Sequence, residues 1–258
     1  MVDPVVVGPS DTPPVRWRIS EEGIATIHMC DVSGRNALSE AFVDALSTAI
    51  AAVGDDLSAR VTILTGTREV FCSGASKAVL RRLIDGTILP SEIRLPTQIL
   101  SSKIPIIAAM EGHAVGGGFA VGLSADIVIM ANESRYGCNF MDLGLTPGMG
   151  TTRLLEHVLS EAVAHELLYS CELRRGSKFV GCSGVNYVLP RKEVLPKATE
   201  IALRIADKPR SALVLLKNTL AASRRQLVEN ALVSEKQMHE LIIARPETRQ
   251  MIEDEYFE

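Results

Sequence analysis

Short apolar runs with the length and composition of β-strands recur along the first half of the chain. They are IATIHM at 24–29, VTILTG at 61–66, IPIIAAM at 104–110 and DIVIMA at 126–131. Between the first two runs, residues 39–53 carry a helical pattern, in which Ser39 can cap the N-terminus and the apolar side chains form one stripe. Because strands alternate with helices, the sequence predicts an α/β layered fold rather than a helical bundle.

The C-terminal part of the chain has a different pattern. After Pro190, three helical segments follow one another at 198–207, 211–223 and 227–243, with a break at Pro209 and an end before Pro246. This pattern indicates a helical region that can serve in oligomerisation.

These patterns divide the chain into three expected regions. Residues 1–14 carry four prolines and no hydrophobic periodicity, which indicates a loosely attached lead. The α/β core is expected at 15–195 and the helical region at 196–258.

Charge and composition exclude several classes of function. A net charge of −4 argues against binding to nucleic acid through its phosphates, which requires a basic surface. No apolar run reaches the roughly 18 residues of a membrane span, and the N-terminus lacks the charged and apolar blocks of a signal peptide. We therefore expect a cytoplasmic protein without nucleic-acid or membrane partners.

The cysteines do not indicate a disulfide framework or a zinc site. Their number is odd and no two form a C-x-x-C pair, so we expect buried, reduced thiols and no metal site. They are Cys30, Cys72, Cys138, Cys171 and Cys182.

Three consecutive glycines, Gly116 to Gly118, follow a predicted strand and precede a helix of small residues. They are not a dinucleotide fingerprint, because Val121 stands where G-x-G-x-x-G requires its last glycine. Two interpretations remain: the glycines allow close packing of strand and helix, or free N–H groups at the helix start face a developing negative oxygen. A second donor would complete such a site, and the glycine turn in VFCSGASKAVL at 70–80 is the best candidate.

Taken together with YGCNFMDLGLTPGMGTTRLL at 136–155, these two motifs resemble the crotonase, or enoyl-CoA hydratase/isomerase, superfamily. The resemblance extends over roughly residues 15–258 and includes RNALS at 35–39. It implies a spiral of strand, strand and helix units with a C-terminal helical region that forms trimers.

The resemblance also implies an oxyanion hole for a thioester carbonyl. Its two backbone N–H donors correspond to Ala75 and Gly117 here. The neighbouring Gly74 and Gly116, with Arg35, are expected to bind substrate. We expect the same of Phe140, which lies in the stretch 136–155.

The sequence departs from typical hydratases of this family at two positions. These enzymes carry glutamates where this chain has Ala120 and Phe140. Adding or removing water needs a positioned general acid and base, so ordinary hydratase activity is not expected. Decarboxylation needs neither carboxylate, because loss of CO₂ leaves a dienolate whose oxygen the two N–H groups stabilise.

Two stretches, NFMDLGLTPGMGTT at 139–152 and QMHE at 237–240, resemble the decarboxylating members of polyketide β-branching (HMG-CoA synthase) cassettes. Those enzymes convert 3-methylglutaconyl groups on an acyl carrier protein to 3-methylcrotonyl groups. The resemblance implies this reaction, an acyl carrier protein as partner, and no cofactor apart from the carrier's phosphopantetheine. It further implies a homotrimer or a dimer of trimers.

The same resemblance places His239 at the active site, where it would hold the leaving carboxylate or protonate the dienolate; the alternative is a surface histidine on an amphipathic helix. The subgroup also uses a lysine after the first oxyanion motif, but residues 78–94 contain none. Lys77 precedes them and either supplies that charge or is a solvated residue. Other candidate partners for the carboxylate are Arg81, Arg82 and Arg94.

Two other functions remain open at this point. One is a dehydratase, or a combined dehydratase and decarboxylase, acting on a 3-hydroxyacyl thioester. The other is a catalytically inactive binding subunit, which the missing glutamates at 120 and 140 would suit.

Overall fold

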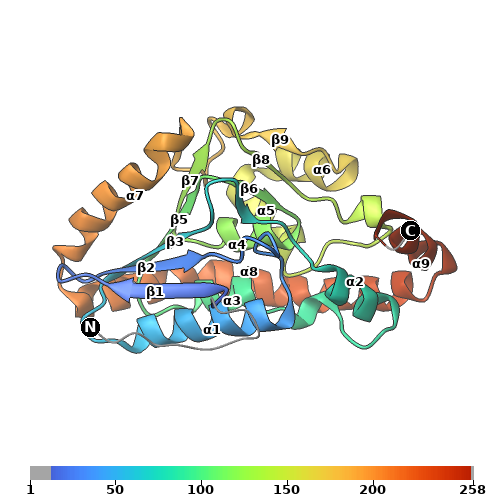
Figure 1. Cartoon of the computed structure of the whole chain (residues 1–258), viewed down its shortest axis with the longest axis horizontal. Helices are drawn as coiled ribbons and strands as arrows, with labels where there is room; N and C mark the ends of the chain where they lie inside the picture. The colour runs from blue at the N-terminus through green and yellow to red at the C-terminus, as the bar shows by residue number, and fades with distance from the viewer. Residues whose placement is uncertain (1–12, 257–258) are drawn as a thin grey trace.

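The structure, a computed structural model, describes residues 13–256 (Figure 1). The expected lead at 1–14 lies almost entirely outside the described residues. The first strand begins at Val15, where the sequence predicts the start of the core.

The larger sheet has six strands in the order β1-β2-β3-β5-β7-β10. All neighbours are parallel except β1 and β2, which form an antiparallel pair. The four strands predicted from the sequence are confirmed as β2, β3, β5 and β7. The strands are β1 Val15–Ile19, β2 Ile24–Met29, β3 Val61–Thr65, β5 Ile106–Met110, β7 Ile127–Ala131 and β10 Tyr187–Leu189.

The smaller sheet has four strands in the order β4-β6-β8-β9 and positions both glycine motifs. They are β4 Val70–Cys72, β6 His113–Val115, β8 Arg135–Gly137 and β9 Arg174–Arg175. Because β4 and β6 pair in parallel, their C-terminal ends lie at the same edge of the sheet. The two motifs follow these ends directly, so the sheet brings them together.

Helices cover the sheets and alternate with the strands. Ser39 caps α1, accepting a hydrogen bond from the backbone N–H of Phe42, as the sequence predicts. The helices are α1 Glu40–Asp55, α2 Lys77–Ile84, α3 Leu95–Leu100, α4 Gly117–Leu123, α5 Thr151–Leu159, α6 Glu161–Ser170, α7 Arg191–Ala206, α8 Arg210–Ile243 and α9 Pro246–Tyr256. Short 3-10 turns occur at Pro90–Glu92, Met141–Leu143 and Gly176–Phe179.

The C-terminal helices differ from the prediction in one respect. The segments expected at 211–223 and 227–243 are a single helix, α8, which runs along the long axis of the molecule (Figure 1). The expected gap was wrong because residues 224–226 contain neither glycine nor proline, and their sequence, Arg-Arg-Gln, favours a helix. A further helix, α9, begins at Pro246, whose fixed φ suits the first helical position.

Helix α7 packs on the larger sheet through Val194, Ala198 and Ala202, all fully buried. The boundary expected between 195 and 196 therefore falls within a helix that covers the core. At the other end of the molecule, α9 lies against α2 (Figure 1). Within residues 13–256, no helix has the length and apolar character needed to cross a membrane.

Candidate active site

The two glycine motifs approach each other closely at the edge of the smaller sheet. Gly74 adopts a φ of +89°, a left-handed conformation that favours glycine. A β-carbon there would lie 2.9 Å from the carbonyl oxygen of Val115, so the missing side chain lets the first motif approach the second. The N–H of Leu38 donates to the carbonyl of Gly74 at 2.7 Å and fixes the other side of this turn.

The backbone N–H groups of Ala75 and Gly117 both lack an acceptor among the described residues. Gly117 is the first residue of α4, where an N–H has no partner within the helix. Among the hydrogen bonds between described residues, none is donated by either N–H. Both residues line one pocket, so the structure brings the two expected donors together.

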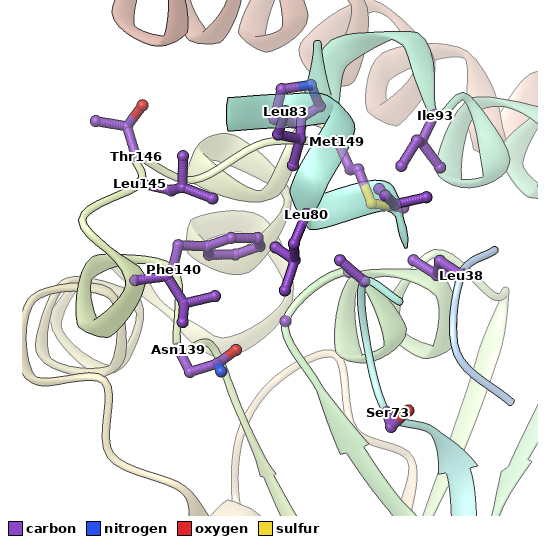
Figure 2. A pocket seen from close by; sticks show the side chains of 16 residues that line it. Leu38, Ser73, Leu80, Leu83, Ile93, Asn139, Phe140, Leu145, Thr146 and Met149 are labelled. Carbon is purple, nitrogen blue, oxygen red and sulfur yellow. The ribbon is translucent and has the colours of Figure 1, made fainter. Parts of the chain in front are cut away.

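This pocket encloses a cavity of about 50 Å³, enough for a few water molecules. Phe140 and Leu80 face each other across it (Figure 2). None of the described residues that line it is charged, and its only polar side chains are those of Ser73, Asn139 and Thr146. The lining consists of Leu38, Ser73, Ala75, Val79, Leu80, Leu83, Pro90, Ile93, Gly116, Gly117, Asn139, Phe140, Leu143, Leu145, Thr146 and Met149.

Only two of the four expected substrate-binding residues line the pocket. Gly116 and Phe140 line the pocket, whereas Gly74 supports it from the turn described above. Arg35 is exposed and does not belong to the lining. Ala120 is fully buried and also lies outside the lining.

His239 is fully buried and is therefore not a surface histidine. Its Nε2 lies 3.0 Å from the carbonyl oxygen of Thr146, and because a carbonyl only accepts, Nε2 donates. Nδ1 has no partner among the described residues. Burial lowers the pKa of His239, which favours the neutral imidazole. Since Thr146 lines the pocket and His239 does not, the imidazole lies one layer behind the wall.

The basic side chains suggested by the sequence lie away from this pocket. Lys77 is the exposed first residue of α2 and does not line the cavity. Arg81 pairs with Glu253, Arg82 with Glu40 and Arg94 with Glu229. In the part of the chain that the structure describes, no group of three or more His, Cys, Asp or Glu side chains could hold a metal ion.

Sequence reasoning did not identify Glu235, which lies one turn before His239 on α8. Its fully buried carboxylate accepts hydrogen bonds from the N–H groups of Gly150 and Thr152, at 2.7 and 2.9 Å. It also accepts one from the Thr152 hydroxyl at 2.7 Å. These hydrogen bonds lower the pKa of Glu235, but burial raises it and has the larger effect. The spacing of four residues from His239 was the only signal in the sequence.

Comparison with known proteins agrees with this geometry. A family model described as enoyl-CoA hydratase/isomerase matches residues 20–258. The chain belongs to the enoyl-CoA hydratase/isomerase family. This family member is 37% identical over 236 residues to the bacillaene synthase decarboxylase PksI of Bacillus subtilis (strain 168), covering 92% of this chain and 95% of PksI. It is 30% identical to the crotonyl-CoA hydratase of Syntrophomonas wolfei, across 76% of this chain and 77% of that enzyme.

Two solved structures similar to this family member come from dehydratase or decarboxylase systems. One belongs to a dehydratase/decarboxylase enzyme couple involved in polyketide β-branching, with a TM-score of 0.89 and 37% identity over 95% of this chain and all of the other. The other is the ECH2 decarboxylase domain of CurF from Lyngbya majuscula, with a TM-score of 0.87 and 35% identity over the same shares. The expected crotonase fold and the likeness to β-branching decarboxylases are confirmed.

Proposed function

We propose that this enzyme is a decarboxylase of polyketide β-branching that acts on a 3-methylglutaconyl-type thioester carried by an acyl carrier protein. The observation that carries the proposal is the pocket itself. It presents the N–H groups of Ala75 and Gly117, which have no acceptor within residues 13–256, in a lining whose described residues are uncharged. The decarboxylases among its relatives support the same reaction.

The reaction breaks the bond between the γ-carbon and the terminal carboxylate of the acyl group. The electron pair of that bond forms a new double bond, and the negative charge moves along the conjugated system to the thioester oxygen. The N–H groups of Ala75 and Gly117 stabilise this oxygen, an interaction that strengthens as the charge develops. Protonation of the γ-carbon then gives the 3-methylcrotonyl product.

The uncharged lining favours loss of CO₂ for a separate reason. A carboxylate that enters an apolar cavity loses its hydration, and none of the described lining residues supplies a countercharge. Decarboxylation removes the charge from this apolar end and moves it to the thioester oxygen, which the two N–H donors bind. A glutamate in the lining would oppose substrate binding by repulsion between like charges.

In this proposal His239 acts as the imidazolium, which holds the departing carboxylate or protonates the dienolate, because in the neutral ring the one proton lies on Nε2 and is donated to Thr146. The negative charge of the substrate favours the charged ring. The support is its position, because it is hydrogen-bonded to a residue of the pocket wall, Thr146, and its Nδ1 is unpartnered among the described residues. The roles expected for Lys77 and Arg35 have no such support from the pocket geometry.

A carrier protein loaded with 3-methylglutaconyl and 3-hydroxy-3-methylglutaryl groups provides the test. Mass spectrometry after incubation is expected to show loss of one CO₂ from the first substrate. Loss of one water from the second, without loss of CO₂ from the first, would identify a dehydratase instead. No change in either substrate would leave the inactive binding subunit as the function.

The proposal includes an acyl carrier protein as partner and a homotrimer or dimer of trimers. Exposed apolar side chains on α8 support subunit contact: Leu215, Leu216 and Leu220 have exposed fractions of 70%, 55% and 65%. Sedimentation as a monomer at all concentrations would contradict the assembly. The expected cytoplasmic location stays a prediction.

A further inference from the structure

Glu235 is a buried carboxylate that the proposed chemistry does not use. It has no exposed surface, and no lysine, arginine or histidine pairs with it among the described residues. Burying an unpaired carboxylate is unfavourable unless hydrogen bonds compensate for the lost hydration. Among the described residues, the hydrogen bonds that compensate for its lost hydration all come from Gly150 and Thr152 at the start of α5.

The backbone that Glu235 holds is conformationally unusual. Met149 and Gly150 are consecutive residues in the left-handed region, with φ of +63° and +79°. For a residue with a side chain, such as Met149, this conformation is unfavourable and persists only where surrounding contacts impose it. The bond from the Gly150 N–H to Glu235 is one such contact.

Met149 in turn contacts the expected oxyanion hole. A β-carbon on Gly117 would lie only 2.5 Å from the sulfur of Met149, so this side chain packs directly over Gly117. Both residues line the pocket. A shift of the backbone at Met149 would therefore move the wall beside one of the two N–H donors.

A second contact from α8 holds the other end of the same segment. His239, one turn after Glu235, donates to the carbonyl of Thr146. The wall segment, residues 146–152, is thus attached to one face of α8 near both of its ends. Its central residue, Met149, lies between the two attachments.

We propose that Glu235 is a positioning residue of this active site, which fixes the wall segment so that Met149 holds Gly117 in place for oxyanion binding. Its role in turnover rests on the proposed decarboxylase function. Its structural role does not, and the two are measured separately.

The test is Glu235→Gln in the full chain. The new amide group places an N–H₂ donor against N–H donors of α5, so at least one of the three hydrogen bonds is lost. We expect kcat for decarboxylation to fall about 10- to 100-fold, with KM changed less than about threefold, because small misplacement of catalytic groups affects the transition state most. In ¹H–¹⁵N spectra we expect the amide signal of Gly117 to shift.

Lys217→Met is the matched control on the same helix. Lys217 is also buried, and its Nζ lies 2.8 Å from both carboxylate oxygens of Asp126. Neither residue lines the pocket. Arg224 remains paired with Asp126 in this variant. We expect reduced thermal stability with kcat and the Gly117 signal unchanged.

Thr152→Val is the milder variant should Glu235→Gln not fold. It removes one hydrogen bond to Glu235 while keeping the side-chain volume. The expected changes have the same direction and are smaller. A folded Glu235 or Thr152 variant with an unmoved Gly117 signal and kcat equal to that of the control would overturn the proposal. If the wild-type chain decarboxylates nothing, the Gly117 signal still decides the structural role.

Discussion

The side chain of Cys72 lies directly against Gly118: a β-carbon on that glycine would be 2.7 Å from the sulfur and 2.3 Å from the carbonyl oxygen of Cys72. Strand β4 and helix α4 therefore touch through backbone where the two glycine motifs meet. The middle glycine, Gly117, has a different neighbour, the flexible side chain of Met149. The triplet thus combines both interpretations of the sequence, close packing at Gly118 and a free N–H at Gly117.

The first prediction concerns the stability of two alanine variants. Gly118→Ala drives its methyl group into a backbone carbonyl that cannot move alone, whereas Gly117→Ala meets the ends of two side chains, Met149 and Leu38. We expect Gly118→Ala to lower the free energy of unfolding by more than about 3 kcal/mol and Gly117→Ala by about 1–3 kcal/mol. Urea denaturation of both variants measures the difference. Equal losses of unfolding free energy would mean that the backbone of strand β4 can shift away from the new methyl group as easily as a side chain can.

The second prediction concerns turnover by Gly117→Ala. The displaced N–H no longer aligns with the thioester oxygen, so we expect kcat to fall about 10²-fold, the scale for loss of one oxyanion donor. Shortening the neighbour in Gly117→Ala/Met149→Ala removes the contact with the sulfur and should recover part of the rate. Single-turnover kinetics on the carrier-bound substrate gives the comparison. A double variant no faster than Gly117→Ala would show that Met149 does not set this geometry.

The sequence was sufficient for four strands of the larger sheet because apolar runs are a local pattern. The oxyanion pair was expected from the family resemblance and stays a prediction. Alternating apolar runs identify strands, and each glycine motif stands directly after one of them. That the two motifs meet follows from the parallel pairing of β4 with β6, which the family resemblance implied.

The wall of the pocket was not predictable in the same way. Glu235 is 85 residues from Gly150 in the chain, and only the path of α8 brings them together. Asn139 lies in the stretch 139–152 that resembles the decarboxylases, but its place in the pocket lining depends on how the loop after β8 folds.

The third prediction concerns the reactivity of thiols. Burial raises the pKa of Cys72 to about 12, so its reactive thiolate is scarce at pH 8. We expect iodoacetamide at pH 8 to modify Cys30 and Cys182, which are partly exposed, before Cys72. Peptide mapping by mass spectrometry identifies the modified sites. Because Cys72 stays protected, decarboxylation should survive, and rapid inactivation with label on Cys72 would contradict this.

The fourth prediction concerns His239 and pH. Burial lowers its pKa below the ordinary 6.5, so the unfolded chain takes up this proton at higher pH than the folded chain. The stability contributed by the neutral imidazole is therefore complete above pH 6.5 and is lost as the pH falls toward the folded pKa. Unfolding free energies between pH 7.5 and 5 should decline more steeply for the wild type than for His239→Gln. Parallel curves would show that His239 does not titrate with folding.

We also expect replacement of His239 to change the rate of decarboxylation. His239→Ala should slow loss of CO₂ about 10²-fold, the scale for a positioned acid or base, while substrate binding changes less because the two N–H donors remain. Turnover at the wild-type rate by a folded variant would assign His239 to structure alone.

The fifth prediction separates the two positions where hydratases of this family carry glutamates. Phe140 is half-buried and lines the pocket, whereas Ala120 has no exposed surface and lies outside the lining. We expect Phe140→Glu to fold and to lower kcat/KM for decarboxylation at least about tenfold, because its carboxylate repels that of the substrate. Ala120→Glu instead buries a carboxylate without a partner and should cost about 3–5 kcal/mol of stability.

Assays of both variants with a crotonyl thioester complete this comparison. Neither should hydrate it, since each lacks the second carboxylate that acid–base catalysis needs. The matched control is Phe140→Leu, which keeps the pocket apolar and should retain most of the decarboxylase activity. If Phe140→Glu and Phe140→Leu slow the reaction equally, the loss arises from the missing aromatic ring, and the uncharged lining is not what favours departure of CO₂.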